Sequence, residues 1–136
     1  LWSRGLGDVY KRQEIINKGF KQNYVAYTSE NSHYSVAKNA SFCGLGKDNV
    51  RYIKSNKYGQ IDTKSLEAQI NIDIKNGDVP FYINATAGTT VLCAFDDIEE
   101  ISKISRKYNI WLHIDGAFGG SVIFTEKYFQ LSTTPW

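Results

Sequence analysis

The sequence contains little of what marks several large classes of protein. Its two cysteines, Cys43 and Cys93, are too few for a disulfide framework or a cysteine-rich zinc site. No stretch approaches the length of about 18 apolar residues that a transmembrane helix needs. Lysine and arginine barely outnumber aspartate and glutamate, 16 against 14, so neither nucleic acid nor an anionic membrane is an expected partner. The small number of cysteines fits a reducing compartment, and we therefore expect a cytoplasmic protein.

What is present is the composition of one globular domain. Hydrophobic residues make up 42% and charged residues 22% of the 136 residues, which suits one domain and not two. Residues 1–13 show no helical or strand period, and we expect a native loop, an expression scar or an assembly error there. Residues 14–136 are expected to form a partial domain, because no closing element follows the last apolar residues.

Apolar runs and helical periods alternate along the chain. The apolar runs predict strands at residues 24–27, 50–53, 80–84 and 110–114. Helices are predicted at residues 34–42, at 63–75 and from about 97 to 108. In the second helix, Leu66, Ile70 and Ile74 recur every four residues and Thr63 is the expected N-cap. Asp96 or Asp97 is the expected cap of the third helix.

This alternation predicts an α/β fold with a mostly parallel sheet flanked by helices. Ligands of such sheets bind beyond the carboxyl ends of the strands. The segments at those ends are residues 28–33, 55–59, 85–90 and 115–120.

Three of these segments carry side chains suited to ligand binding, and each also has a structural interpretation. Asp115 is either a charge partner for a ligand or the cap of the next turn. Residues 85–90 offer hydroxyl groups beside small residues, but an ordinary polar loop has the same composition. His33 is suited to stacking, proton donation or metal binding, or it simply begins a helix.

An iron site is a weaker alternative. His113 and Asp115 are two residues apart and share one face of a strand. With His33 they supply the ligands of a two-histidine-one-carboxylate site, although the third ligand lies upstream, unlike the usual order.

Four segments in order resemble one protein family. They are Thr28-Ser-Glu-Asn-Ser-His33-Tyr-Ser, Asn84-Ala-Thr-Ala-Gly-Thr-Thr90, Ala94-Phe-Asp96 and Trp111-Leu-His-Ile-Asp115-Gly-Ala117. Together they resemble the group II pyridoxal-phosphate-dependent decarboxylases, especially those acting on glutamate and cysteine sulfinate. The resemblance covers about residues 14–128. It implies part of the large domain of an aspartate-aminotransferase-type (fold type I) enzyme and a homodimeric parent protein.

The resemblance also assigns roles to five residues. Asp115 matches the aspartate that pairs with the pyridine nitrogen of pyridoxal 5'-phosphate. His33 matches the histidine stacked on one face of the ring, and protonation of the product carbon is a further role for it. Ala117 matches the small residue on the opposite face. Thr90, and with a weaker match Thr86, lie near the cofactor.

The implied activity is removal of the α-carboxylate of glutamate, aspartate or cysteine sulfinate. The alternatives are an aromatic-amino-acid decarboxylase and a non-catalytic protein of the same fold. The family's Schiff-base lysine lies roughly thirty residues beyond the matching aspartate, and Lys127 is too close to Asp115 to fill that role. The loop that holds the cofactor phosphate is also not found. We therefore expect a fragment that is inactive by itself.

Overall fold

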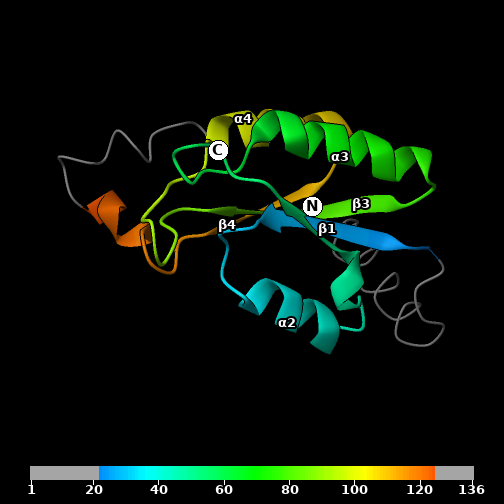
Figure 1. Ribbon diagram of the computed structural model, residues 1–136, viewed down its shortest axis with the longest axis horizontal. Helices are drawn as coiled ribbons and strands as arrows, with labels where there is room; N and C mark the ends of the chain where they lie inside the picture. The colour runs from blue at the N-terminus through cyan, green and yellow to red at the C-terminus, as the bar shows by residue number, and fades with distance from the viewer. Residues whose placement is uncertain (1–21, 125–136) are drawn as a thin grey trace, which may run out of the picture.

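The computed structural model describes residues 22–124, in which four parallel strands form one sheet flanked by helices (Figure 1). This arrangement confirms the predicted fold class. Residues 1–21 and 125–136 lie outside the described part, so the predictions for residues 1–13 and Lys127 concern residues that are not described. The elements are β1 (Tyr24–Ser29), α2 (Ser35–Phe42), the 3-10 helix η1 (Lys47–Asn49), β2 (Val50–Ile53), α3 (Thr63–Lys75), β3 (Val79–Thr86), α4 (Ile98–Tyr108), β4 (Trp111–Asp115) and the 3-10 helix η2 (Gly120–Phe124).

The strands lie in the order β2-β1-β3-β4, and every neighbouring pair is parallel. All carboxyl ends therefore meet at one edge of the sheet. There the last residues of β3 and β4, Thr86 and Asp115, are register partners. The sheet thus brings together two predicted site residues from separate segments of the chain.

The two faces of the sheet differ. Helices α3 and α4 cover one face and α2 lies on the other (Figure 1). The hydrophobic core lies on the α3 and α4 side, where Val25, Tyr27, Ile83 and Ala85 of the central strands are fully buried with Leu66 and Ile101 of the helices. Because successive side chains of a strand point to opposite faces, the residues between these point toward α2.

Three strands run further than the apolar runs predicted. β1 continues to Ser29, β3 spans Val79–Thr86 and β4 ends at Asp115. Ala85 and Thr86 therefore belong to a strand and not to a loop. Polar residues extend these strands because pairing with neighbouring strands satisfies their backbone groups, as between Thr86 and Asp115.

Helix α3 has the predicted bounds, but two of its details differ. The N-cap is Asp62, and Thr63 is the first helical residue. Ile74 is 46% exposed, while Asp73 is buried at 2% exposure. At 3.6 residues per turn, a residue seven positions after Leu66 returns to the same side of the helix, whereas the eighth has rotated past it. Ile74 therefore lies outside the buried side of α3, although it continues the four-residue spacing of Leu66 and Ile70.

Asp73 is buried because it has polar partners. Its Oδ2 accepts a hydrogen bond from the Tyr27 hydroxyl (2.9 Å), and its Oδ1 accepts one from Nε of Arg51 (3.2 Å). A second carboxylate, that of Asp78, pairs with Nη2 of the same arginine at 3.2 Å. The network joins α3 to β1 and β2.

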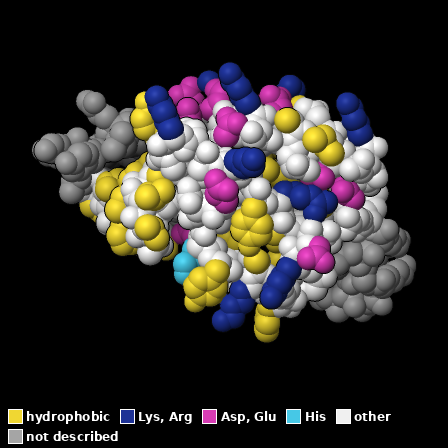
Figure 2. All heavy atoms as spheres, in the orientation of Figure 1, with side chains coloured by type: hydrophobic (Ala, Val, Ile, Leu, Met, Phe, Trp, Pro, Cys, Tyr) yellow, Lys and Arg dark blue, Asp and Glu magenta, His cyan; other side chains and the backbone are white. Residues whose placement is uncertain are grey.

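Helix α4 begins as the sequence predicts. Asp97 is its N-cap, and the Asp97 Oδ1 accepts a hydrogen bond from the Glu100 backbone N–H at 3.0 Å. The helix ends at Asn109, which adopts the left-handed conformation. No helix within residues 22–124 has the length and apolar character to cross a membrane. Figure 2 shows charged side chains of both signs mixed over the visible face, in line with the balanced composition.

Candidate functional site

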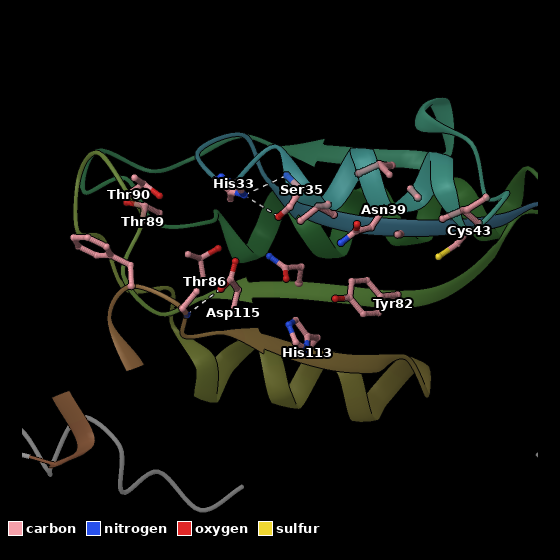
Figure 3. Close-up of a pocket in the computed structure, with 18 of the residues that line it drawn as sticks. His33, Ser35, Asn39, Cys43, Tyr82, Thr86, Thr89, Thr90, His113 and Asp115 are labelled. Atoms are coloured by element: carbon pink, nitrogen blue, oxygen red, sulfur yellow. Dashed lines mark hydrogen bonds between the residues drawn. The ribbon is translucent and has the colours of Figure 1, made fainter. Parts of the chain in front are cut away.

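A cavity of about 700 Å³ lies between the sheet and α2, at the carboxyl ends of the strands. Strands β3 and β4 line one side, and the residues around α2 line the other (Figure 3). All of the residues predicted from the motifs line this one cavity: His33, Thr86, Thr90, Asp115 and Ala117. The fold therefore gathers side chains from three separate segments of the chain.

Strand alternation decides which side chains of β3 and β4 face the cavity. Tyr82, Asn84 and Thr86 of β3 line it, as do His113 and Asp115 of β4. The residues between them on β3 belong to the core on the opposite face. The sequence analysis singled out Thr86 alone among these three β3 residues. Because every second residue of a strand lies on the same face, the position of Thr86 could also have indicated Asn84 and Tyr82.

Among the described residues, Asp115 has one carboxylate oxygen engaged and one without a hydrogen-bond partner. Its Oδ1 accepts a hydrogen bond from the Ala117 N–H at 3.1 Å, so the side chain does cap the turn that follows β4. Within residues 22–124, no hydrogen bond reaches its Oδ2. The two interpretations of Asp115 are therefore compatible, since the capped carboxylate keeps one oxygen for a ligand.

Thr86 places a hydroxyl group beside this carboxylate. The residue is 4% exposed, and its Oγ1 is buried without a hydrogen bond to any described residue. A buried hydroxyl without a partner costs free energy unless something satisfies it. Because Thr86 lines the cavity, a bound ligand is well placed to supply that partner.

Asp96 holds the backbone of Thr86 in place. Its Oδ2 accepts a hydrogen bond from the Thr86 N–H, and its Oδ1 accepts one from the Ile61 N–H, both at 2.7 Å. Burial raises the pKa of this carboxyl, although the two hydrogen bonds act in the opposite direction. The sequence analysis considered this residue as a possible helix cap and as part of a family segment, but missed its bridging role.

The loops after β3 and β4 touch through their backbones. The Gly119 N–H donates to the Ala87 carbonyl at 3.0 Å, and a Cβ on Gly119 would lie 2.3 Å from that oxygen. Gly88 has a φ of +90° at the same contact, which favours glycine. This close approach fixes the loops that carry Thr90 and Ala117, two of the predicted site residues.

The two histidines occupy different parts of the cavity wall (Figure 3). Nδ1 of His33 lies 2.9 Å from Oγ of Ser35, and the His33 ring lies against Tyr34 with 4.2 Å between ring centroids. The His113 ring stacks on Tyr82 at 5.9 Å between centroids. Burial and the negative charge of Asp115 raise the pKa of the Tyr82 hydroxyl.

The structure does not support the iron alternative within the described residues. His33, His113 and Asp115 do line the same cavity. Among residues 22–124, however, no three histidine, cysteine, aspartate or glutamate side chains are placed to hold a metal ion.

Comparison with known proteins identifies relatives of the chain. The pyridoxal-dependent decarboxylase conserved domain matches residues 8–134. The chain is 46% identical over 110 residues to a glutamate decarboxylase of Drosophila melanogaster, covering 81% of this chain and 22% of that protein. It is 44% identical over 105 residues to a cysteine sulfinic acid decarboxylase of Homo sapiens, covering 77% and 21%.

A solved structure has the same fold. The crystal structure of mouse CSAD matches with a TM-score of 0.86 and 36% identity, over 91% of this chain and 26% of that one. The chain thus spans roughly a fifth of the curated relatives and a quarter of this solved one. Motif order, sheet topology and these matches agree, and the chain belongs to the family of the pyridoxal-dependent decarboxylase conserved domain.

Proposed function

We propose that this chain forms one wall of the cofactor site of a pyridoxal-phosphate-dependent decarboxylase that removes the α-carboxylate of an acidic amino acid. The observation that carries this proposal is the single cavity lined by His33, Thr86, Thr90, Asp115 and Ala117. Bound pyridoxal phosphate supplies an electron sink for the electrons of the broken bond. Because the chain spans about a fifth of its curated relatives, the activity is proposed for the whole protein.

The residues present fit this cofactor. The ring nitrogen of pyridoxal phosphate needs a carboxylate partner to remain protonated, and Asp115 has a carboxylate oxygen without a partner among the described residues. The cofactor also carries oxygen atoms that accept hydrogen bonds, and the Thr86 hydroxyl is buried without an acceptor among residues 22–124. The donor set of the cavity is therefore suited to a flat, polar ring bearing a cationic nitrogen.

Asp115 would hold the ring nitrogen and favour its protonated form. His33 would lie against one face of the ring, and Ala117 would leave room for it on the other face. Thr86 and Thr90 would contact its polar edge. Holding the ring between two side chains orients the substrate bond that breaks, which lowers the entropic part of the barrier.

The choice of an acidic substrate is supported by the relatives. Glutamate and cysteine sulfinic acid, named in the two curated relatives reported above, both carry an acidic side chain. The side chains that would recognise this second acidic group are not identified within residues 22–124. We propose glutamate, aspartate or cysteine sulfinate as substrates.

We further propose a cytoplasmic homodimer. The segments after β3 and β4 expose large hydrophobic residues, which are Val91 and Leu92 after β3, Phe118 after β4 and Phe124 at the end of η2. Figure 2 shows hydrophobic side chains gathered at this end of the molecule. An apolar patch beside a cavity is typical of an interaction surface. The proposed cytoplasmic location is supported by the two cysteines, which are both free and exposed.

The test is release of carbon dioxide by the purified whole protein supplied with pyridoxal phosphate. Glutamate, aspartate, cysteine sulfinate and an aromatic amino acid are compared as substrates. We expect turnover of at least one acidic substrate, abolished by Asp115→Ala and severely reduced by Asp115→Asn. The control Asp97→Asn, an exposed cap outside the cavity, should retain wild-type activity.

Two results would contradict the proposal. One is turnover of the aromatic amino acid alone, which would favour the aromatic alternative. The other is full activity of the Asp115→Ala variant, which would remove the carboxylate from the mechanism. The 136-residue chain alone is expected to be inactive, so turnover by it would show that the rest of the whole protein is dispensable.

A further inference from the structure

The hydrogen bonds around His33 define which ring nitrogen carries the proton. The Ser35 backbone N–H donates to Nδ1 of His33 at 3.3 Å. A backbone N–H is only a donor, so Nδ1 must present its lone pair. The Ser35 Oγ lies 2.9 Å from the same nitrogen and must then donate as well. The proton of the neutral ring is therefore on Nε2.

Local structure explains why these bonds form. Ser35 is the first residue of α2, whose N–H has no partner within the helix. The N-cap residue, Tyr34, makes no capping hydrogen bond with its side chain. The imidazole of His33 takes the place of the missing cap and accepts the free N–H. The Tyr34 ring packs against the imidazole from the side, with 4.2 Å between centroids.

The remaining ring nitrogen is available to a ligand. Within residues 22–124, both hydrogen bonds of the His33 ring are made by Nδ1, and none reaches Nε2. His33 and Ser35 both line the cavity and lie together at its edge in Figure 3. A neutral imidazole held in this way offers a donor, and not a base, to whatever the cavity contains.

We propose that Ser35 is a positioning residue whose backbone N–H holds His33 in the Nε2–H form and whose hydroxyl fixes the direction of the ring, so that His33 donates a hydrogen bond to the bound ligand. Its effect on turnover rests on the proposed function, but the tautomer itself does not. Ser35→Ala removes the hydroxyl donor and leaves the backbone donor. Ser35→Thr keeps both the hydroxyl donor and the backbone donor. Ser41→Ala is the matched control, since among residues 22–124 its hydroxyl bonds the Ala37 carbonyl alone, on the same helix and outside the cavity.

The primary test is nitrogen-15 NMR of the full chain labelled at histidine, at a pH where the imidazole is neutral. The sequence has two histidines, so a His113→Asn variant identifies the signals of His33. We expect the chemical shifts of His33 to report a protonated Nε2 and an unprotonated Nδ1. Ser35→Ala should leave the tautomer ratio unchanged, because a hydroxyl both donates and accepts and so bonds either tautomer, whereas the retained backbone N–H bonds only an unprotonated Nδ1. Ser35→Thr and Ser41→Ala should also leave it unchanged.

A protonated Nδ1 in the unmodified chain would overturn the proposal, as would a Ser35→Ala variant of the whole protein with the wild-type kcat. The second readout is kcat of the whole protein, expected to fall several-fold in Ser35→Ala and to be restored in Ser35→Thr. A fixed Nε2–H tautomer in a protein that decarboxylates nothing would leave the role of Ser35 standing while the proposed function fails. Decarboxylation by a protein whose His33 shows a mixture of tautomers would leave the proposed function standing while the role of Ser35 fails.

Discussion

Replacing Asp96 by asparagine tests whether this carboxylate stabilises the backbone beside the cavity. Each of its oxygens accepts one backbone N–H at 2.7 Å, from Ile61 and from Thr86. Asparagine keeps one acceptor oxygen and turns an NH₂ group toward the other N–H. A hydrogen bond to a charged group contributes about 1.5–3 kcal/mol. Because burial raises the pKa of this carboxyl, its desolvation offsets part of that contribution, and we expect a net loss of about 1–2 kcal/mol.

The assay is urea denaturation of the full chain followed by far-UV circular dichroism. With a slope of about 2 kcal/mol per molar urea, the midpoint should fall by about 0.5–1 M. Asp97→Asn is the control, because the neighbouring residue is an exposed N-cap and asparagine caps a helix equally well. The reasoning is refuted if Asp96→Asn unfolds at the wild-type midpoint, or if both variants lose stability equally.

Two further predictions use the same denaturation assay. Gly119→Ala should lower stability by about 1–3 kcal/mol, since its Cβ would lie 2.3 Å from a backbone oxygen that cannot move aside. Gly120→Ala, whose Cβ would have no atom of residues 22–124 within 4 Å, should be neutral, and equal losses would contradict the contact. Tyr27→Phe should cost about 1 kcal/mol at neutral pH, because Asp73 loses a donor. Burial and Asp73 raise the Tyr27 pKa, so the advantage of tyrosine is fully present below pH 10.0 and should be lost as the pH rises further. An advantage that persists or grows at alkaline pH would contradict this.

The sequence predicted the fold class because the periods of its apolar residues are unambiguous. Ile101 and Ile104 of α4 are buried as the pattern required. The pattern failed where a polar group occupies a core position. Asp73 is buried because Tyr27 and Arg51 come to it from two strands, and no local spacing encodes that meeting.

The site was predicted less completely than the fold. The motif residues do line one cavity, but the roles assigned to them remain predictions. Asp96 was missed as a bridge because its partners, Ile61 and Thr86, belong to distant segments. Ser35 was missed because its significance depends on which way the His33 ring turns, and one-dimensional spacing holds no such information.

The most direct test is a crystal structure of the whole protein with pyridoxal phosphate bound. We predict that the pyridine nitrogen lies within hydrogen-bonding distance of the Asp115 carboxylate, with His33 and Ala117 on opposite faces of the ring. A cofactor bound elsewhere, or bound here with its ring nitrogen away from Asp115, would contradict the proposed function.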